Sequence, residues 1–426
     1  MTLLSAQLSS ASLEVGFASH EIIPGKETPL GGYGTEKRRV IPFSWSNIKP
    51  NFRYFKNNKG MLDQIRVKAM VLKKNNVKLL FLSFDLVGMP AEFYLALSPK
   101  LIPLGFDPNL MYLSATHTHS GPGSLSKNFF WQVFAMDNFN KEFYQEVVQV
   151  VLETVIQADT DLVEADLFHT TYNTQGLQSN RRGSDRPLDP RVNLLMAKSK
   201  SGSWLGGLVN FAVHGVSLDD DNLLFSSDTP GAIERESEKF LREQGSVDPL
   251  ILFQNGAEGD VHPTHFGVEG IQKMGESFAT QMKDAWSQLA LIEDSFKAKY
   301  FDVDLGAPLS HLSNCARFSW LPDGMKIKLK KYFPSKSRIW QLQLGPLLFM
   351  TWPGEATTEL GLRLKNSTNQ IPWILGLTND HLAYFTTPEE FNVGGYETCI
   401  NFYGPDGGMK ILKAHQSMIN NSKIKF

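Results

Sequence analysis

The stretch VKLLFLSFD, residues 77–85, combines β-branched, aromatic and leucine side chains and ends at an aspartate. A short apolar run of this kind, followed by polar or turn-forming residues, predicts a buried β-strand. The same pattern occurs at four further places in the chain. These are LMYLSAT (110–116), WLGGLVNFAV (204–213), PLILFQ (249–254) and PLLFMTW (346–352). The runs together predict a largely buried sheet.

Segments with helical spacing of apolar residues lie between these runs. Residues 143–155 and 271–286 carry apolar side chains at helical intervals, and a third helix is expected to start at Asp228. Strands that alternate with helices predict an α/β fold, with a mixed β-sheet core flanked by helices. No linker, charge block or internal repeat divides the chain, so we expect a single large domain over residues 1–426.

Composition and charge narrow the class of protein. The chain has 426 residues, with 42 Lys and Arg against 44 Asp and Glu, and a formal net charge of −2. This balance disfavours nucleic-acid binding, which needs clustered positive charge. Only Cys315 and Cys399 are present, which excludes a disulfide framework and a cysteine-rich zinc module. We expect two buried free thiols, with one disulfide as the alternative.

The sequence shows no recognisable targeting or membrane-spanning segment. Residues 1–17, MTLLSAQLSSASLEVGF, have neither the basic start nor the apolar run of a signal peptide. No stretch approaches the roughly 18 consecutive apolar residues of a transmembrane helix. We therefore expect a soluble, cytoplasmic protein, with secretion or membrane association as the alternative.

Polar side chains follow several predicted strands at the point where each strand ends, which is where α/β proteins bind ligands. The candidates are Asp85, His117, His214, the loop QNGAEGDVHP (254–263) and Glu355. In THTHSGPG (116–123), His117 and His119 point to the same face if the strand continues through them, because side chains alternate along a strand. Two imidazoles on one face suit a divalent metal ion; two hydrogen-bonded histidines are the alternative.

His214 and Glu355 extend this candidate metal site. Taken alone, His214 also suits a hydrogen-bonded core histidine, and Glu355 suits a carboxylate at the N-terminus of a helix over ATTELGLRLK (356–365). Taken together, two or three neutral imidazoles and a carboxylate, with one coordination position open, are typical of a catalytic zinc site. The sequence has no C-x-x-C or H-E-x-x-H motif, which disfavours structural zinc and the common metalloproteases.

Six motifs occur in the order found in neutral ceramidases. They are THTHSGPG (116–123), NFAVHG (210–215), SSDTPG (226–231), NGAEGDVHP (255–263), WPGEATTELG (352–361) and a segment from Tyr384 through Tyr396 to YGP (403–405). The chain therefore resembles the neutral/alkaline non-lysosomal ceramidase family from about residue 13 to residue 406. The resemblance implies that family's α/β catalytic domain and a lipid-like N-acyl substrate.

The resemblance also implies residue roles that periodicity alone does not indicate. The zinc ligands would be His117, His214, Glu355 and Tyr384. His119 would act as general base, and Arg181 and Tyr396 would face the substrate carbonyl and polar head. The implied reaction is zinc-dependent hydrolysis of the amide bond of ceramide, which yields a fatty acid and a sphingoid base. Without the resemblance, Tyr384 and Tyr396 would be interpreted as ordinary packing residues.

The chain departs from the family pattern in three respects. His262 stands where the family has a serine with an assigned catalytic role; it could transfer protons, bind metal, reshape the pocket or be a loop histidine with no such role. The chain ends about thirty residues after Tyr396, so we expect no carboxy-terminal immunoglobulin-like domain. The family is often secreted or membrane-associated, whereas no signal peptide is seen here.

These departures bear on the identity of the substrate more than on the identity of the metal. The first hypothesis is a ceramidase. The second is a zinc amidohydrolase that acts on a different N-acyl lipid or N-acyl amine, and the third is a catalytically silent relative that binds lipid or metal. The set His117, His119, His214, Glu355 and Tyr384 is complete in this sequence. A complete set argues against the silent relative.

Overall fold

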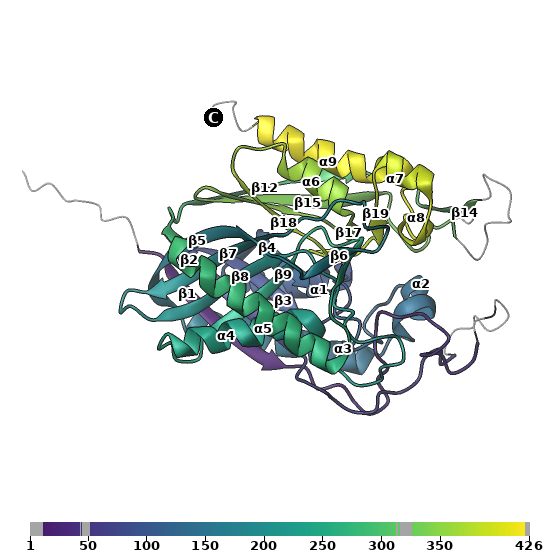
Figure 1. Ribbon diagram of the computed structural model, residues 1–426, viewed down its shortest axis with the longest axis horizontal. Helices are drawn as coiled ribbons and strands as arrows, with labels where there is room; N and C mark the ends of the chain where they lie inside the picture. The colour runs from purple at the N-terminus through teal and green to yellow at the C-terminus, as the bar shows by residue number, and fades with distance from the viewer. Residues whose placement is uncertain (1–11, 43, 45–51, 312–313, 316–325, 422–426) are drawn as a thin grey trace, which may run out of the picture.

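Two β-sheets stacked face to face form the centre of the protein, and helices cover the outer face of each sheet (Figure 1). The computed structural model describes residues 12–42, 44, 52–311, 314–315 and 326–421. The expected α/β fold with a mixed sheet core flanked by helices is confirmed. Residues 1–11, which belong to the segment compared with a signal peptide, lie outside the described residues.

The larger sheet contains the first four of the five strands predicted from apolar runs. Its order is β4-β3-β2-β1-β5-β7-β8-β9, and β11 pairs with β5. The strands are β1 (Glu14–Glu21), β2 (Arg66–Lys74), β3 (Val77–Phe84), β4 (Phe106–Ala115), β5 (Val163–Asn173), β7 (Arg191–Ser199), β8 (Trp204–Phe211), β9 (Leu250–Asn255) and β11 (Ala290–Leu291). Only the pairs β3/β4 and β8/β9 are parallel, so the sheet is mixed.

The smaller sheet has the order β12-β15-β16-β18 and contains the fifth predicted strand. Its strands are β12 (Phe296–Asp304), β15 (Lys336–Leu344), β16 (Leu347–Thr351) and β18 (Ile371–Leu375). Aromatic side chains fill the space between the two sheets: the Phe81 ring lies 5.4 Å from Phe349, which lies 4.7 Å from Trp373. Because central strands are buried on both faces, their sequences are nearly continuous apolar runs.

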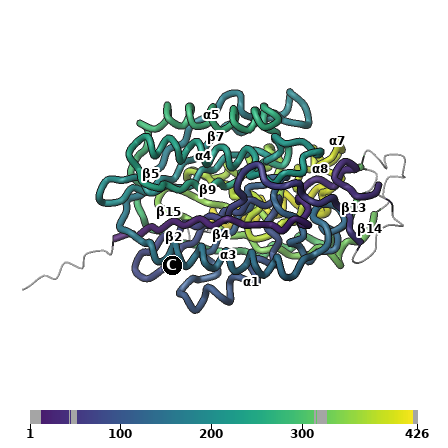
Figure 2. Tube along the Cα trace, turned by 90° about the horizontal axis from the view of Figure 1, so that it is seen from below, coloured from purple at the N-terminus to yellow at the C-terminus, as the bar shows by residue number. Residues whose placement is uncertain are grey.

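Helices bury the outer faces of both sheets (Figures 1 and 2). Those on the larger sheet are α1 (Ala91–Leu101), α3 (Lys141–Thr160), α4 (Asp228–Glu243) and α5 (Gly267–Ala285), and the 3₁₀ turns η2 (Ile102–Leu104) and η4 (Trp286–Gln288) follow α1 and α5. Those on the smaller sheet are α6 (Thr358–Lys365) and α9 (Gly404–Asn421). The three predicted helices are therefore confirmed as α3, α4 and α5. Among the described residues, no helix combines the length and hydropathy needed to cross a bilayer.

Short elements gather where the parallel strands end. The backbone pairs Phe84↔Ala115 and Phe211↔Asn255 end β3/β4 and β8/β9, and an isolated bridge between Thr118 and Gly215 joins the two loops that follow. The short elements are β6 (Gln178–Asn180) with β10 (Val261–Pro263), β17 (Glu355–Ala356) with β19 (Tyr384–Phe385), β13 (Leu309–His311) with β14 (Lys326–Lys328), α2 (Phe129–Trp131), the π-helical turn η3 (Gln132–Met136), α7 (Pro388–Val393) and α8 (Tyr396–Cys399).

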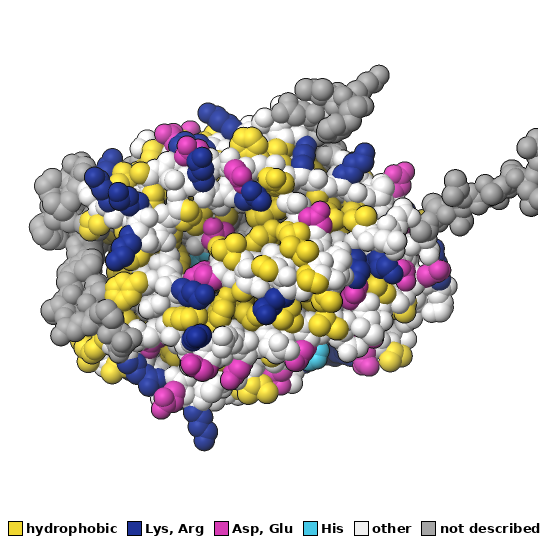
Figure 3. Space-filling view, turned by 180° about the vertical axis from the view of Figure 1, so that it is seen from behind, with side chains coloured by type: hydrophobic (Ala, Val, Ile, Leu, Met, Phe, Trp, Pro, Cys, Tyr) yellow, Lys and Arg dark blue, Asp and Glu magenta, His cyan; other side chains and the backbone are white. Residues whose placement is uncertain are grey.

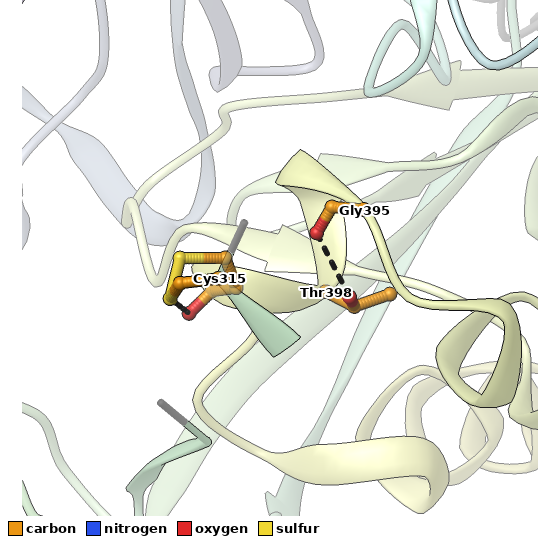
Figure 4. Close-up of a disulfide and its surroundings, with 4 residues drawn as sticks. Cys315, Gly395 and Thr398 are labelled. Atoms are coloured by element: carbon orange, nitrogen blue, oxygen red, sulfur yellow. Dashed lines mark hydrogen bonds between the residues drawn. A yellow bond between two sulfur atoms is a disulfide. The ribbon is translucent and has the colours of Figure 1, made fainter. Parts of the chain in front are cut away.

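The two cysteines form a disulfide, so the expectation of two free thiols is wrong. Leu309 N–H donates to the carbonyl of Phe402 at 2.8 Å, which holds the segment before Cys315 beside the segment after Cys399. The bridge lies at the end of α8, where the Thr398 hydroxyl donates to the carbonyl of Gly395 (Figure 4). Residues 84 positions apart are joined in this way, a proximity that neither cysteine's sequence context indicates.

Replacement of Cys399 by serine is expected to lower the free energy of unfolding by about 2–4 kcal/mol, because the bridge restricts the unfolded chain. Denaturant titration of both proteins measures this difference. A reducing agent should destabilise the parent to the same extent and leave the double variant Cys315→Ser/Cys399→Ser unchanged. Titration of two free thiols in the denatured, unreduced parent would contradict the bridge.

Candidate metal centre and catalytic site

The four residues proposed as metal ligands come together from separate elements. His117 and His214 follow β4 and β8, whereas Glu355 and Tyr384 lie in β17 and β19. His117 Nε2 lies 3.2 Å from Glu355 Oε2, and His214 Nε2 lies 3.3 Å from the same oxygen. The Tyr384 hydroxyl lies 3.2 Å from His214 Nε2. All four side chains are buried.

The side chains of His117 and His119 lie close together, as expected. The expectation that they do so because a strand continues through both residues is wrong. Strand β4 ends at Ala115, and His117 has a φ of +70°, so neither histidine lies on the strand. The turn brings the two Nε2 atoms to 3.4 Å. Gly215 permits this packing, because a Cβ there would lie 2.7 Å from the Thr118 Cα. A left-handed histidine at such a place is backbone strain of the kind found at functional sites.

Glu355 does not begin a helix, which corrects the expectation that helix α6 starts there. It forms the two-residue strand β17, and α6 begins only at Thr358. Strand β17 pairs in parallel with β19 in the register Glu355↔Tyr384. This backbone pairing, rather than a helix dipole, places the carboxylate and the phenol side by side.

The hydrogen bonds of the two histidines decide what their other nitrogens can do. His117 Nδ1 lies 2.5 Å from the carbonyl oxygen of Val87, and His214 Nδ1 lies 3.0 Å from that of Val261. A carbonyl oxygen only accepts, so each Nδ1 carries the proton and each Nε2 presents a lone pair. Both lone pairs face Glu355 Oε2, which receives no hydrogen bond among the described residues. Arg181 Nη1 also lies 3.2 Å from His214 Nε2. Two imidazole nitrogens that converge on an unpaired carboxylate oxygen fit a cation, and these ligand types fit zinc.

Electrostatics keep His214 in its metal-binding protonation state. Burial, with positive charge at Arg181, holds the pKa of His214 well below its ordinary value. Its imidazole is therefore neutral at pH 7, so a metal does not have to displace a proton from it.

Arg181 lies inside the site rather than on the surface. Its Nη2 donates to the Tyr384 hydroxyl at 3.1 Å and to the Gly259 carbonyl at 2.6 Å. Its Nε donates to Glu397 Oε1 at 2.7 Å, and the neighbouring Arg182 contacts the other oxygen of Glu397 at 2.5 Å. Glu397 thus fixes the guanidinium. This carboxylate could not be identified from the sequence, because 216 positions separate it from Arg181 and no spacing rule links them.

His262 also lies at the site, beside Arg181 and with its ring 5.9 Å from that of His214. It sits in β10 opposite Ser179 of β6, and its Nε2 is 3.3 Å from Arg181 Nη1. Burial, with the charge of Arg181, lowers the pKa of His262 to about 4, so its ring is neutral at pH 7. His262 is absent from the described groups whose ligand atoms converge closely enough to hold one ion.

Two further residues proposed from the sequence, Tyr396 and Asp85, differ in whether they line the site. Tyr396 is 59% exposed, lines the cavity described below, and its ring lies 5.2 Å from the guanidinium carbon of Arg181. Asp85 is buried and accepts from Arg66 N–H at 2.8 Å and from the Thr116 hydroxyl at 3.2 Å. Asp85 does not line the cavity, so it supports the loop before His117 and is not a member of the site.

Two site residues were not identified individually from the sequence. His381 Nε2 lies 3.2 Å from Glu355 Oε1, and its ring stacks on Trp131 at 5.0 Å. Glu258 is fully buried, and its ligand atoms converge with those of His117 and Glu355. Its position inside the QNGAEGDVHP loop was the available signal, since that loop follows a predicted strand. His381, three positions before Tyr384, had no comparable signal.

A cavity of about 1440 Å³ opens above these residues. Much of its wall is apolar and aromatic, including Phe129, Phe130, Trp131 and Phe134 from α2 and the turn that follows. The proposed ligands, His119, Arg181 and His262 contribute the polar part of the lining. Figure 3 shows hydrophobic side chains gathered beside a hollow on one face of the molecule. Such a site can hold a long apolar molecule with a polar group at the histidines.

Comparison with known proteins identifies related chains. Residues 53–285, more than half of the chain, match the family described as neutral/alkaline non-lysosomal ceramidase, N-terminal. The neutral ceramidase of Pseudomonas aeruginosa is 25% identical over 70% of this chain and 57% of its own length. Neutral ceramidase B of Dictyostelium discoideum is 25% identical over 70% of this chain and 59% of its own length. The chain thus spans less than two thirds of these relatives.

Solved structures share the fold. The crystal structure of neutral ceramidase from Pseudomonas aeruginosa superposes with a TM-score of 0.79 at 19% identity, over 97% of this chain and 75% of that one. A ceramidase complexed with C2 gives the same TM-score at 17% identity and with the same coverage. The family match over more than half of the sequence shows that this chain belongs to the neutral/alkaline non-lysosomal ceramidase family.

Proposed function

We propose that this protein is a zinc-dependent amidohydrolase that cleaves the amide bond of ceramide to a fatty acid and a sphingoid base. The observation that carries the proposal is the convergence of two imidazole lone pairs and a carboxylate oxygen at a large, mostly apolar cavity. Membership of the ceramidase family supports the reaction type, and the names of the related proteins support ceramide as substrate.

The ligands proposed for zinc are His117, His214, Glu355 and Tyr384. The chemistry that bound Zn²⁺ supplies is Lewis acidity, which polarises an amide carbonyl and lowers the pKa of a water molecule toward ~7. The carbonyls of Val87 and Val261 fix the ring orientations that point both Nε2 atoms at the ion. The Arg181 contact orients the Tyr384 hydroxyl.

His119 is the proposed general base. Its Nε2 lies 3.4 Å from His117 Nε2, and no described residue hydrogen-bonds its Nδ1. Burial holds the pKa of His119 well below its ordinary value, so the ring is neutral at pH 7. Nε2 can then accept a proton from the attacking water and later return it to the leaving amine.

Arg181 and Tyr396 are the proposed stabilisers of the oxyanion. Glu397 holds the guanidinium in place before substrate binds, and a preorganised donor of this kind is worth about 3–4 kcal/mol in the transition state. Tyr396, which is 59% exposed as a residue, lines the cavity and can contact a polar head group there. His262 sits behind Arg181, and its proposed role is to position the guanidinium by accepting from Nη1.

The second candidate is a zinc amidohydrolase that acts on a different N-acyl lipid or N-acyl amine. His262 favours it, because an imidazole, larger than the serine that the family resemblance implies at this position, lines the cavity next to Arg181. Both candidates place an acyl chain against the apolar wall.

We also propose that one domain carries the site, because its residues come from strands and loops of both sheets. The cytoplasmic location remains a prediction. The Cys315–Cys399 disulfide counts against the cytoplasm, since disulfides persist mainly in oxidising compartments.

Purified protein is expected to contain about one zinc ion per chain. The variant Glu355→Gln should lose most of it, because the amide keeps the shape but not the charge. Elemental analysis of both proteins measures the metal. Glu359→Gln, the same change at a partly exposed position of α6, is the matched control and should retain the metal. A fully active parent without metal would refute the zinc proposal.

The variant His119→Ala is expected to lose about 10²–10⁴-fold in turnover while it retains its zinc, because it removes the proton acceptor and not a ligand. Initial rates of amide hydrolysis and metal content, measured on the same preparation, separate the two roles. His265→Ala, which removes a histidine outside the cavity lining, should hydrolyse normally. Near-normal rates for His119→Ala would show that another group takes the proton.

A substrate panel distinguishes the candidate functions. Fluorescent ceramide and a series of shorter N-acyl amines are incubated with the zinc-loaded protein, and the released fatty acid is measured. Release from ceramide is expected, with little from short acyl chains that leave the apolar wall uncovered. Release from another amide and none from ceramide would favour the second candidate. No release from any amide would indicate a silent relative.

A further inference from the structure

Glu258 is a buried carboxylate beside the proposed metal centre that has no partner. Its side chain is fully buried in the loop between β9 and β10, and neither carboxylate oxygen has a hydrogen bond among the described residues. One ligand atom each from His117, Glu258 and Glu355 lies within 4.8 Å of the other two. The mechanism proposed above does not use Glu258.

Backbone contacts fix Glu258 in this position. Gly259 N–H donates to the Ala356 carbonyl at 2.8 Å, which ties the loop to β17 next to Glu355. Gly376 packs against the carboxylate, since a Cβ there would lie 2.7 Å from Glu258 Oε2. Val261 N–H closes the turn on the Glu258 carbonyl at 2.8 Å. The backbone of this loop is therefore fixed, and it holds the Glu258 carboxylate beside the proposed metal centre.

A cation beside Glu258 would stabilise its buried negative charge. Two neighbouring buried carboxylates repel each other, and a buried charge without a partner is costly. Arg181 is the nearby guanidinium, but its hydrogen bonds go to other groups, namely Glu397, Tyr384, the Gly259 carbonyl, His214 and His262. No hydrogen bond from it to Glu258 is present among the described residues. A bound metal ion would supply the missing positive charge.

Two groups of described residues have ligand atoms that converge closely enough to hold an ion, namely His117, His119 and His214, and His117, Glu258 and Glu355. One ion is sufficient, because the two groups share His117, whose Nε2 has a single lone pair. We propose that Glu258 is a further carboxylate ligand of the ion that His117, His214 and Glu355 hold, a step that rests on the metal site of the proposed function. Two carboxylates balance the charge of a divalent ion. Metals such as Mn²⁺ prefer oxygen ligands, so a site with two carboxylates should bind them more tightly than a site with one.

Metal binding by the full chain tests this assignment. The parent, Glu258→Gln and Glu258→Leu are stripped of metal, and their Zn²⁺ affinity is measured by competition with a coloured chelator. Each is then loaded with Co²⁺, and its visible absorption spectrum is recorded, because that spectrum depends on the ligands bound to cobalt. Glu390→Gln, which alters a buried carboxylate in the α7 cap, is the matched control.

Both Glu258 variants are expected to bind Zn²⁺ at least about 100-fold more weakly, beyond the 10–100-fold typical of groups that only orient a ligand, and to change the Co²⁺ spectrum. Without metal, Glu258→Gln should melt at the parent's temperature or above it, since it removes repulsion with Glu355, and zinc should raise its melting temperature less. Parent-like affinity, or weaker affinity with an unchanged spectrum, would overturn the assignment. A parent that binds no metal would instead refute the proposed function itself.

Discussion

Two backbone carbonyls, those of Val87 and Val261, set the chemistry of the whole centre. Each accepts the Nδ1 proton of a histidine, so each Nε2 presents a lone pair, and both lone pairs point at the same oxygen of Glu355. The arrangement is unfavourable without a cation and favourable with one. Three further features maintain this arrangement. They are the burial of the site, the left-handed turn at His117 and the guanidinium that Glu397 holds in place.

The centre depends on the packing of two sheets that contribute different ligands. The larger sheet ends in the loops that carry His117 and His214, whereas Glu355 and Tyr384 lie on segments that follow β16 and β18 of the smaller sheet. The Asn379 side chain links the two, because it donates to the Met111 carbonyl and accepts from Leu113 N–H. A shift between the sheets would therefore separate the imidazoles from the carboxylate.

Much of the fold could be predicted, because buried strands and amphipathic helices leave local patterns. The five apolar runs became β3, β4, β8, β9 and β16. Features that depend on distant segments could not be predicted in this way. The Cys315–Cys399 bridge and the contact of Glu397 with Arg181 join positions far apart in sequence. The two histidines of THTH do converge, but through a turn with positive φ and not through the alternation of a strand.

The sequence by itself determined the α/β class, the order of the elements, the family resemblance and the residue types that could bind a metal. Each of these depends on patterns of residues that are close together in the chain. Only the tertiary structure decided which of those residues meet. It excluded Asp85, paired Glu355 with Tyr384 through β17 and β19, and brought Glu258 and His381 to the centre. The physical reason is that convergence depends on backbone hydrogen bonds and sheet packing between distant segments, which no local pattern encodes.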